Sequence, residues 1–245
     1  MIRRIHPQSE IVDITHGIPR HDVRLAALVL RKTLPYMPVG VHVAVVDPRV
    51  GSERRALALS CGDGRFLVGP DNGVLSLAWQ SCGGVVEAVD VSRSPKRLEP
   101  VSATFHARDV FAPVAAHLAA GAELSRLGEP LDPQDLLAVE LPAPRLEAGR
   151  LVGHVLAVDG FGNVELNLTA DHLKEAGAEL AGEIELGTSG GRFFGTFERT
   201  FADVRPGDVI VYEDAYRSLA IAINQGDAAA VMRLRAGDEV EVSVR

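Results

Sequence analysis

Three residues of the types that can hold and activate a water molecule stand next to predicted secondary-structure elements. Asp47 follows the β-branched run 41–46 and precedes Pro48. Arg54 comes seven residues after Asp47, and His106 stands just before a helix-like segment. A guanidinium is a rigid fork that can hold a carboxylate and a water together, and a histidine can orient water or exchange its proton. This combination favours an enzyme that acts on a small molecule.

Each of these residues also has a structural interpretation. Asp47-Pro48 is a common way to end a strand, Arg54 and Arg55 could form a solvated pair, and His106 could be a satisfied histidine at a helix entry. The functional interpretation has one physical argument on its side, since sites in open α/β sheets lie at the carboxyl ends of strands. Taken singly, these residues leave both interpretations open.

The segment 158–163 is a second candidate, because Asp159, Phe161 and Asn163 join a carboxylate, an aromatic ring and an amide within five residues. Its structural interpretation is a hairpin turn that uses glycine for positive φ. Its functional interpretation is that the ring stacks on a heterocycle, the amide hydrogen-bonds the edge of that heterocycle, and the carboxylate meets a cation.

Other site classes find little support in the sequence. The turn 69–73 lacks the GxGxxG and Walker patterns, so we do not interpret it as a phosphate loop. The eight histidines show no HExxH or facial-triad arrangement. We therefore predict neither a metal site nor a cofactor.

The composition describes a globular chain. Its 245 residues are 47% hydrophobic and 24% charged, with a net charge of −8 and no long basic run. The phosphate-neutralising surface of a nucleic-acid binder is therefore missing. No apolar run approaches the roughly 20 residues of a membrane span, and the N-terminus lacks a signal-peptide pattern. We interpret the two cysteines, Cys61 and Cys82, as reduced thiols of a cytoplasmic protein. We expect no membrane partner.

Residues 1–142 are predicted to form an α/β domain with a mostly parallel sheet flanked by helices. The run 41–46 is too apolar for a half-exposed strand, which suits the middle of a parallel sheet. The expected strands are 11–14, 41–46, 56–60, 65–68 and 85–91, and the expected helices are 21–34, 74–80 and 110–120.

The character of the sequence changes at the proline-containing stretch 141–144, which is the best candidate for a domain boundary. Short β-like runs separated by Gly and Asp turns follow, which predicts a small β-rich domain over residues 150–245, either a barrel or a sandwich. The expected strands are 151–158, 163–168, 183–186, 192–197, 209–212 and 239–244.

Together these segments resemble one family, the S-adenosyl-L-methionine hydrolases (adenosine-forming) or hydroxide adenosyltransferases, which are relatives of the fluorinases and chlorinases. The resemblance runs over nearly the whole chain, and its specificity comes from six or more motifs in the right order. These motifs lie at 11–16, 19–23, 47–54, 69–73, 104–106, 161–163 and 200–203.

The resemblance implies a hydrolytic triad formed by Asp47, Arg54 and His106. The halogenating relatives carry Tyr at the positions of Asp47 and His106 and have no matching arginine, so this chain looks like a water-using member. The implied reaction is attack of water or hydroxide on the ribose 5′ carbon of S-adenosyl-L-methionine, which gives adenosine and L-methionine. S-adenosyl-L-methionine is the substrate, and no cofactor is implied.

The resemblance also implies substrate-binding residues. Asn163 and Phe161 contact the adenine, Phe201 stacks against it, and Asp159 receives the methionine ammonium. The remaining expected binding residues are Thr104 and Phe105, which line the pocket near the ribose and sulfur, and Tyr216, which with Arg217 is a candidate to hold the methionine carboxylate. The family assembles as homotrimers whose active sites lie between one subunit's N-terminal domain and its neighbour's C-terminal domain.

Four departures from the family pattern stand out. The family opens with a strand ending in Thr-Asp-aromatic-Gly, whose aspartate binds the ribose; this chain begins after that point, so we expect that strand and ligand to be missing. Arg49 and Ala107 each stand where the family has Gly, and the segment 213–217 differs from the usual Asn-Ser-rich loop. Two alternative functions therefore stay open: another nucleoside-transferring enzyme, and a non-catalytic protein that binds adenosine or S-adenosyl-L-methionine.

Overall fold

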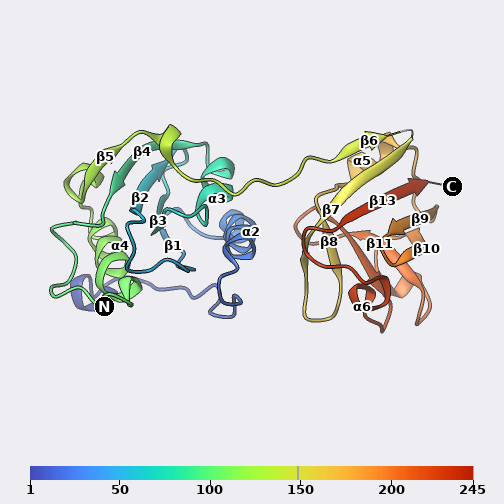
Figure 1. Cartoon of the computed structure of the whole chain (residues 1–245), viewed down its shortest axis with the longest axis horizontal. Coiled ribbons are helices and arrows are strands. Elements are labelled where there is room, and N and C mark those ends of the chain that lie inside the picture. Colours follow the sequence, from blue (N-terminus) through green and yellow to red (C-terminus); the bar gives the residue numbers. More distant parts are fainter. Residues whose placement is uncertain (148, 245) are drawn as a thin grey trace. The chain divides into compact units, whose positions relative to one another are not determined.

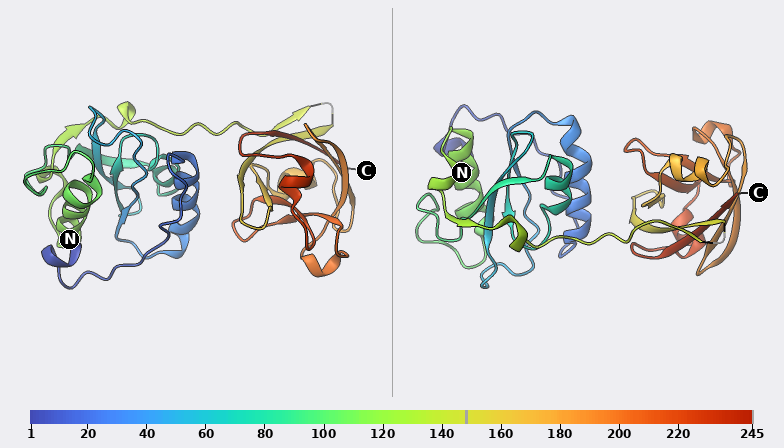
Figure 2. Two further views of the ribbon diagram at one scale, coloured as in Figure 1. Left: turned by 60° about the horizontal axis from the view of Figure 1, so that its bottom comes forward. Right: turned by 90° about the horizontal axis from the view of Figure 1, so that it is seen from above.

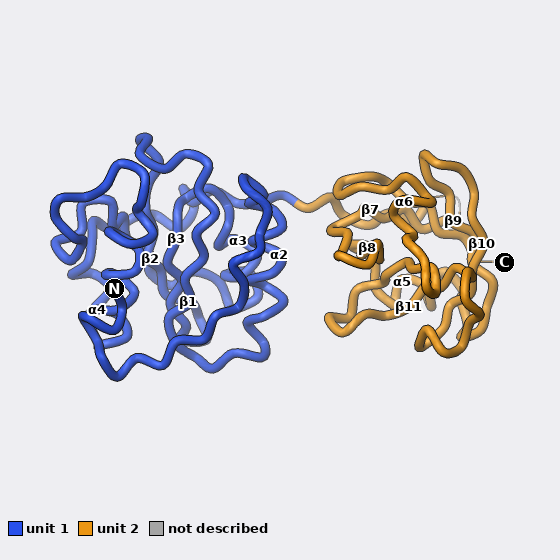
Figure 3. The backbone as a smooth tube through the Cα atoms, turned by 90° about the horizontal axis from the view of Figure 1, so that it is seen from below, with its two compact units in different colours: residues 1–140 blue, residues 141–245 orange. Residues whose placement is uncertain are grey.

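A computed structural model of the chain describes residues 1–147 and 149–244. The chain divides into two compact units, residues 1–140 and 141–245, which Figure 1 labels by element and Figure 3 separates by colour.

A five-stranded sheet with helices on both faces forms the N-terminal unit. The strand order is β1-β3-β2-β4-β5. The strands are β1 (Val41–Val43), β2 (Ala56–Cys61), β3 (Phe66–Pro70), β4 (Val85–Asp90) and β5 (Glu129–Leu131), and the α-helices are α1 (Ile2–Ile5), α2 (Val23–Thr33), α3 (Ser76–Ser81) and α4 (Ala112–Ala119). Short 3₁₀ turns lie at Leu34–Tyr36, Leu124–Arg126 and Pro133–Asp135, and a π-helical turn, Ala107–Phe111, leads into α4.

The prediction of a mostly parallel sheet is wrong, because this sheet is mixed. Only the β1–β3 pair is parallel among the pairings of these five strands, whereas β2–β3, β2–β4 and β4–β5 are antiparallel. The tight turn at 62–65 sends β3 back along β2, and a two-strand hairpin of this kind is antiparallel by construction. Helix α3 then carries the chain across, so that β4 pairs with the other edge of β2.

Two strand predictions also fail. The segment 11–14 has no regular structure, and its Val12 is 57% exposed. The run 41–46 forms a strand only over Val41–Val43, and that strand lies at the edge of the sheet rather than in its middle. Apolar patterning marks both segments as able to form strands, but a strand also needs a neighbouring edge for its backbone hydrogen bonds.

The alternation of side chains along β2 supplies the cores on both faces of the sheet. Leu57 and Leu59 pack in the cluster with residues of α2 and α3, while Ala58 packs on the opposite face with Phe111 and residues of α4. The right panel of Figure 2 shows the helices on either side of this sheet. This packing fixes the position of β2, whose start adjoins Arg54.

A closed β-barrel forms the C-terminal unit. The strands are β6 (Arg145–Glu147), β7 (Arg150–Val158), β8 (Val164–Leu166), β9 (Glu183–Thr188), β10 (Gly191–Phe197), β11 (Val209–Glu213), β12 (Leu219–Ile223) and β13 (Glu239–Val244). The order is β13-β9-β10-β11-β12-β8-β7-β6, and the additional β13–β7 pairing closes seven strands into a ring with β6 outside it. Figure 2, left, shows this ring.

The barrel prediction agrees with this unit, although β12 was not expected. Its sequence, Leu219–Ile223, is a continuous apolar run next to a loop, which carries no alternation to mark a strand. The helices α5 (Ala170–Glu175) and α6 (Ala228–Met232) are short and were also not expected. The apolar core includes Val155, Ile184, Ile221 and Val240.

Across residues 1–147 and 149–244, helices that combine the length and the apolar character needed to cross a membrane are absent.

The alternation of side chains along β2 predicts which substitutions lower the stability of the protein. Leu59 is fully buried, so Leu59→Ala removes apolar contacts and leaves a cavity, and we expect the free energy of unfolding to fall by about 2–5 kcal/mol. Urea denaturation followed by circular dichroism measures this change. The control is Val86→Ala on β4, where the side chain is 68% exposed and the expected loss is small. Equal losses in the two variants would contradict this assignment of the core face.

Candidate active site

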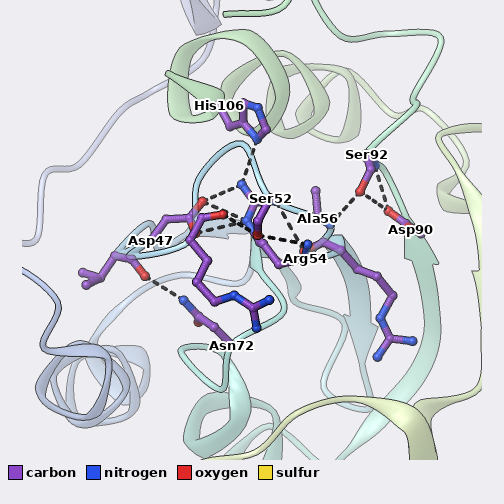
Figure 4. Close-up of polar contacts among 11 residues, drawn as sticks. Asp47, Ser52, Arg54, Ala56, Asn72, Asp90, Ser92 and His106 are labelled. Carbon is purple, nitrogen blue, oxygen red and sulfur yellow. Dashed lines mark hydrogen bonds and ion pairs between the residues drawn. The ribbon is translucent and has the colours of Figure 1, made fainter. Parts of the chain in front are cut away.

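Asp47 and Arg54 form a buried ion pair at the end of the segment that continues β1. The Arg54 Nε donates to Asp47 Oδ2 at 2.9 Å, and Arg54 Nη2 donates to the same oxygen at 2.5 Å. The side chains of Asp47 and Arg54 are only 6% and 4% exposed. Figure 4 shows the Asp47 carboxylate directed at the Arg54 guanidinium, which reaches His106 in turn. The interpretation of Arg54 and Arg55 as a solvated pair is therefore wrong for Arg54.

His106 completes the cluster through Arg54 Nη2, the same guanidinium nitrogen that binds Asp47. The distance from Arg54 Nη2 to His106 Nδ1 is 2.8 Å. A guanidinium only donates hydrogen bonds, so Nδ1 must accept, and the neutral imidazole then carries its proton on Nε2. The arrangement thus defines the tautomer of His106, in which Nε2–H is the second polar group of the ring.

The surroundings of His106 favour its neutral form. Burial is the main cause that lowers the pKa of His106, and the nearby positive charge of Arg54 lowers it further. The carboxylates of Asp47 and Asp109 act in the opposite direction. Since Nδ1 can accept from Arg54 only when it is unprotonated, the electrostatics and the hydrogen bond support the same state.

Arg54 is held on its remaining sides as well. Its guanidinium carbon lies 5.3 Å from the centroid of the Phe111 ring, and Nη1 donates to the Arg55 carbonyl at 3.4 Å. A cation over an aromatic face is stabilised by the ring's quadrupole. Phe111 was missed by the sequence analysis, because its apolar pattern predicts only a core residue.

The loop that carries Asp47 and the loop that carries His106 touch at Gly51. Gly51 has φ +79°, and a Cβ built on it would lie only 2.4 Å from the Ala103 carbonyl oxygen. A larger residue at this position is excluded by its backbone conformation and by the close approach. Ser52 braces the first loop, since its hydroxyl donates to the Arg49 carbonyl at 2.7 Å. Arg49, which stands where the family has Gly, thus contributes its backbone carbonyl to the hydrogen bonding of this loop.

A buried carboxylate holds the loop that precedes His106. Asp109 is 1% exposed and accepts from the Ser102 backbone N–H at 2.8 Å. The hydrogen bond from Arg108 is the main cause that lowers the pKa of Asp109. Arg108 also lies over the Phe105 ring, 4.9 Å from its centroid. Arg108 and Asp109 lie in the π-helical turn that begins at Ala107, and π-bulges are frequent at functional sites.

The predicted binding residues fall into two groups, one in each unit. Thr104 and Phe105 accompany His106 in the N-terminal unit and are both exposed. In the C-terminal unit, Asp159 accepts from the Phe161 and Asn163 backbone N–H groups, and Asn163 Nδ2 donates to Asp159 Oδ2 at 2.8 Å. Asp159 and Asn163 are therefore paired with each other, an arrangement that presents the 81%-exposed Phe161 ring to solvent.

The other two predicted aromatic residues of this unit are accessible. Phe201 and Tyr212 pack with their ring centroids 5.1 Å apart, and Phe201 remains 36% exposed. Tyr216 is 50% exposed, and its backbone N–H donates to Asp214 Oδ1. The structure brings Asp47, Arg54 and His106 into contact, and the ligand roles of the residues in this second group stay predictions.

Groups of three or more His, Cys, Asp or Glu side chains suited to a metal ion are absent from the part of the chain that the structure describes. Cys61 and Cys82 are free and buried, and burial is the main cause that raises the pKa of the Cys61 thiol to about 12. This favours the unreactive thiol form of Cys61.

The fold and this cluster define a class of protein: an α/β unit with a buried Asp–Arg–His site, followed in the chain by a seven-stranded barrel. Residues 1–128 match the SAM hydroxide adenosyltransferase N-terminal domain, and residues 153–241 match the C-terminal domain of the same family. The chain belongs to the SAM hydroxide adenosyltransferase family, which confirms the resemblance found in the sequence.

Individual relatives agree with this assignment. The chain is 42% identical to an (R)-S-adenosyl-L-methionine hydrolase from Salinispora tropica over 99% of its own length and 90% of that protein's length. A fluorinase from an Actinoplanes species is 28% identical over 98% of this chain and 89% of that protein. The crystal structure of an uncharacterized conserved protein from Thermotoga maritima superposes with a TM-score of 0.91 at 35% identity, covering 99% of this chain and 92% of that one.

The contacts in the cluster predict the pKa of His106 and how it responds to substitution of Arg54. We expect a pKa below the ordinary histidine value of 6.5, so that His106 is neutral at pH 7, and we expect Arg54→Met to raise this pKa because a nearby positive charge is removed. NMR titration of histidine-labelled protein measures both values. His117, whose pKa is lowered by burial and then by Lys96, is an internal control that Arg54→Met should leave unchanged. A His106 pKa that does not respond to Arg54→Met would contradict the contact.

Proposed function

We propose that this protein hydrolyses S-adenosyl-L-methionine to adenosine and L-methionine. The observation that carries the proposal is the buried contact of Asp47, Arg54 and His106, in a chain of this family that is 42% identical to a named (R)-S-adenosyl-L-methionine hydrolase. No cofactor enters the proposed reaction. The alternatives of a pure binding protein and of a different nucleoside transfer have no specific observation in their favour.

The proposed reaction is a displacement at the ribose 5′ carbon. The oxygen of water or hydroxide forms a bond to that carbon as the carbon–sulfur bond breaks, and the sulfur takes the electron pair. Methionine leaves as a neutral thioether, so the leaving sulfur needs no general acid. One proton of the attacking water is released overall. What the protein must supply is a positioned oxygen nucleophile that has lost its bulk solvent.

The chemistry of the cluster suits the hydroxide form of the nucleophile. Arg54 is a permanent cation, and the inferred tautomer of His106 offers an Nε2–H donor. Both groups stabilise negative charge on an oxygen, whereas Nδ1 is occupied by Arg54 and does not take up a proton. We therefore assign Arg54 and His106 to orienting the nucleophile and Asp47 to holding the Arg54 fork.

Activity measurements on conservative variants test this proposal. We expect the wild type to form adenosine and methionine from S-adenosyl-L-methionine. Chromatography measures the amounts of both products. We expect Asp47→Asn, Arg54→Lys and His106→Ala each to lower kcat/KM by about 10²-fold or more, because misplaced catalytic groups cost losses of this size. Arg54→Lys keeps the charge and removes the fork, so it tests the fork geometry directly.

His117→Ala is the matched control, since His117 is a half-buried histidine on α4 outside the cluster. Circular dichroism checks that each variant folds. A folded wild type that binds adenosine and forms no product would replace the hydrolase proposal with the binding-protein alternative. If His117→Ala lowers kcat/KM as much as His106→Ala does, the result would contradict a specific catalytic role of the cluster.

We also propose that the protein acts as a homotrimer in the cytoplasm, in which the residues that bind the substrate come from neighbouring subunits. The support is the family resemblance, together with the separation of the predicted residues into one group in each unit. Size-exclusion chromatography with light scattering should give three times the mass of one chain. A monomer that has full activity would contradict the shared site.

A further inference from the structure

The side chain of Asn72 connects the turn after β3 to the segment after β1 that leads to Asp47. Its Nδ2 donates to the carbonyl of Val46 at 2.8 Å, and its Oδ1 accepts from the Val74 backbone N–H at 3.1 Å. Figure 4 shows Asn72 reaching this carbonyl from below the cluster. Val46 is the residue directly before Asp47, so the bond acts one residue from the carboxylate.

The segment 44–46 continues beside β3 after β1 has ended at Val43. The Ala44 N–H donates to the Val68 carbonyl at 3.0 Å, and a Cβ built on Gly69 would lie 2.4 Å from the Ala44 carbonyl oxygen. The two backbones are therefore in close contact up to Ala44. Asn72 extends this attachment by two residues, to the peptide group that leads into Asp47.

A displacement of this peptide group would shift Asp47 and, through its contacts, Arg54 and His106. The Asp47 carboxylate holds the Arg54 guanidinium, and the same guanidinium contacts His106. Because β1 lies at the edge of the described sheet, its continuation has a neighbouring strand on only one side in this unit. A side-chain hydrogen bond then supplies a constraint that the strand ladder does not.

We propose that Asn72 is a positioning residue for hydrolysis, which fixes the Val46 carbonyl and thereby holds Asp47 against Arg54. This inference rests on the proposed hydrolase activity. A competing explanation is local, since an asparagine that accepts a backbone N–H two residues ahead commonly stabilises a turn. The two explanations assign the importance of Asn72 to different atoms: Nδ2 for positioning and Oδ1 for the turn.

Two substitutions separate these atoms. Asn72→Asp keeps an oxygen that can accept from Val74 and removes the donor to Val46. Asn72→Ser keeps a hydroxyl that can accept from Val74, is too short to reach Val46, and adds no charge. We expect both variants to keep the wild-type circular dichroism spectrum and to lose kcat by about tenfold or more, with KM within about twofold.

Asn167 provides the matched control. Its Nδ2 donates to the Pro142 carbonyl at 2.7 Å and its Oδ1 accepts from the His154 N–H at 2.6 Å, so it makes the same pair of backbone contacts in the C-terminal unit. We expect Asn167→Asp to keep kcat within about twofold of the wild type. The second readout is the NMR signal of His106 Nδ1, which should shift in both Asn72 variants and stay in place in Asn167→Asp.

The outcomes are distinguishable. An active wild type with Asn72 variants of unchanged kcat would overturn the positioning role and favour the turn explanation. A folded wild type without activity would overturn the proposed function, while an unchanged His106 signal in the Asn72 variants would separately overturn the link from Asn72 to the cluster. If Asn72→Asp fails to fold, Asn72→Ser decides both points.

Discussion

The buried pair of Asp47 and Arg54 is the interaction on which the arrangement of the site depends. Taking two charges out of water is costly, and the cost is offset only by good geometry and by further hydrogen bonds. Here the carboxylate receives two guanidinium nitrogens, and the guanidinium also contacts His106, the Arg55 carbonyl and the face of Phe111. Removing either charge would leave the other buried and uncompensated. The elements around this pair are accordingly braced by close backbone contact, at Gly51 against Ala103 and at Gly69 against Ala44.

The same pair determines what His106 can do. Because Arg54 occupies Nδ1, the imidazole is neutral and presents a donor at Nε2, so in the proposed reaction it would hold an oxygen rather than remove a proton from it. A cation and a neutral donor side by side favour an anionic nucleophile such as hydroxide. This fits a reaction in which the leaving sulfur already carries a positive charge and the main difficulty is to present an oxygen in line with the carbon.

The two units have different structural roles. In the N-terminal unit, side chains from the segment after β1, from the residue before a π-helical turn and from that turn itself converge on one guanidinium. In the C-terminal unit, the barrel holds a loop in which Asp159 and Asn163 bind each other and leave the Phe161 ring exposed. The carboxylate of Asp159 is bonded within its own loop and so fixes the backbone that carries the exposed Phe161 ring.

The sequence by itself determined the features that depend on local pattern. The periodicity of residues 21–34 and 110–120 predicted α2 and α4, the β-like runs after residue 150 predicted most of the barrel strands, and the ordered motifs identified Asp47, Arg54 and His106. The tertiary structure decided which strands pair, so the sheet is mixed, Ile11 to Ile14 lies outside it, and Leu219–Ile223 becomes a barrel strand. It also decided that the Arg54 guanidinium bridges Asp47 and His106, and which nitrogen of His106 accepts. Strand pairing and side-chain contacts join residues distant in the chain, and no local propensity encodes which backbone edge or charged group will be nearest.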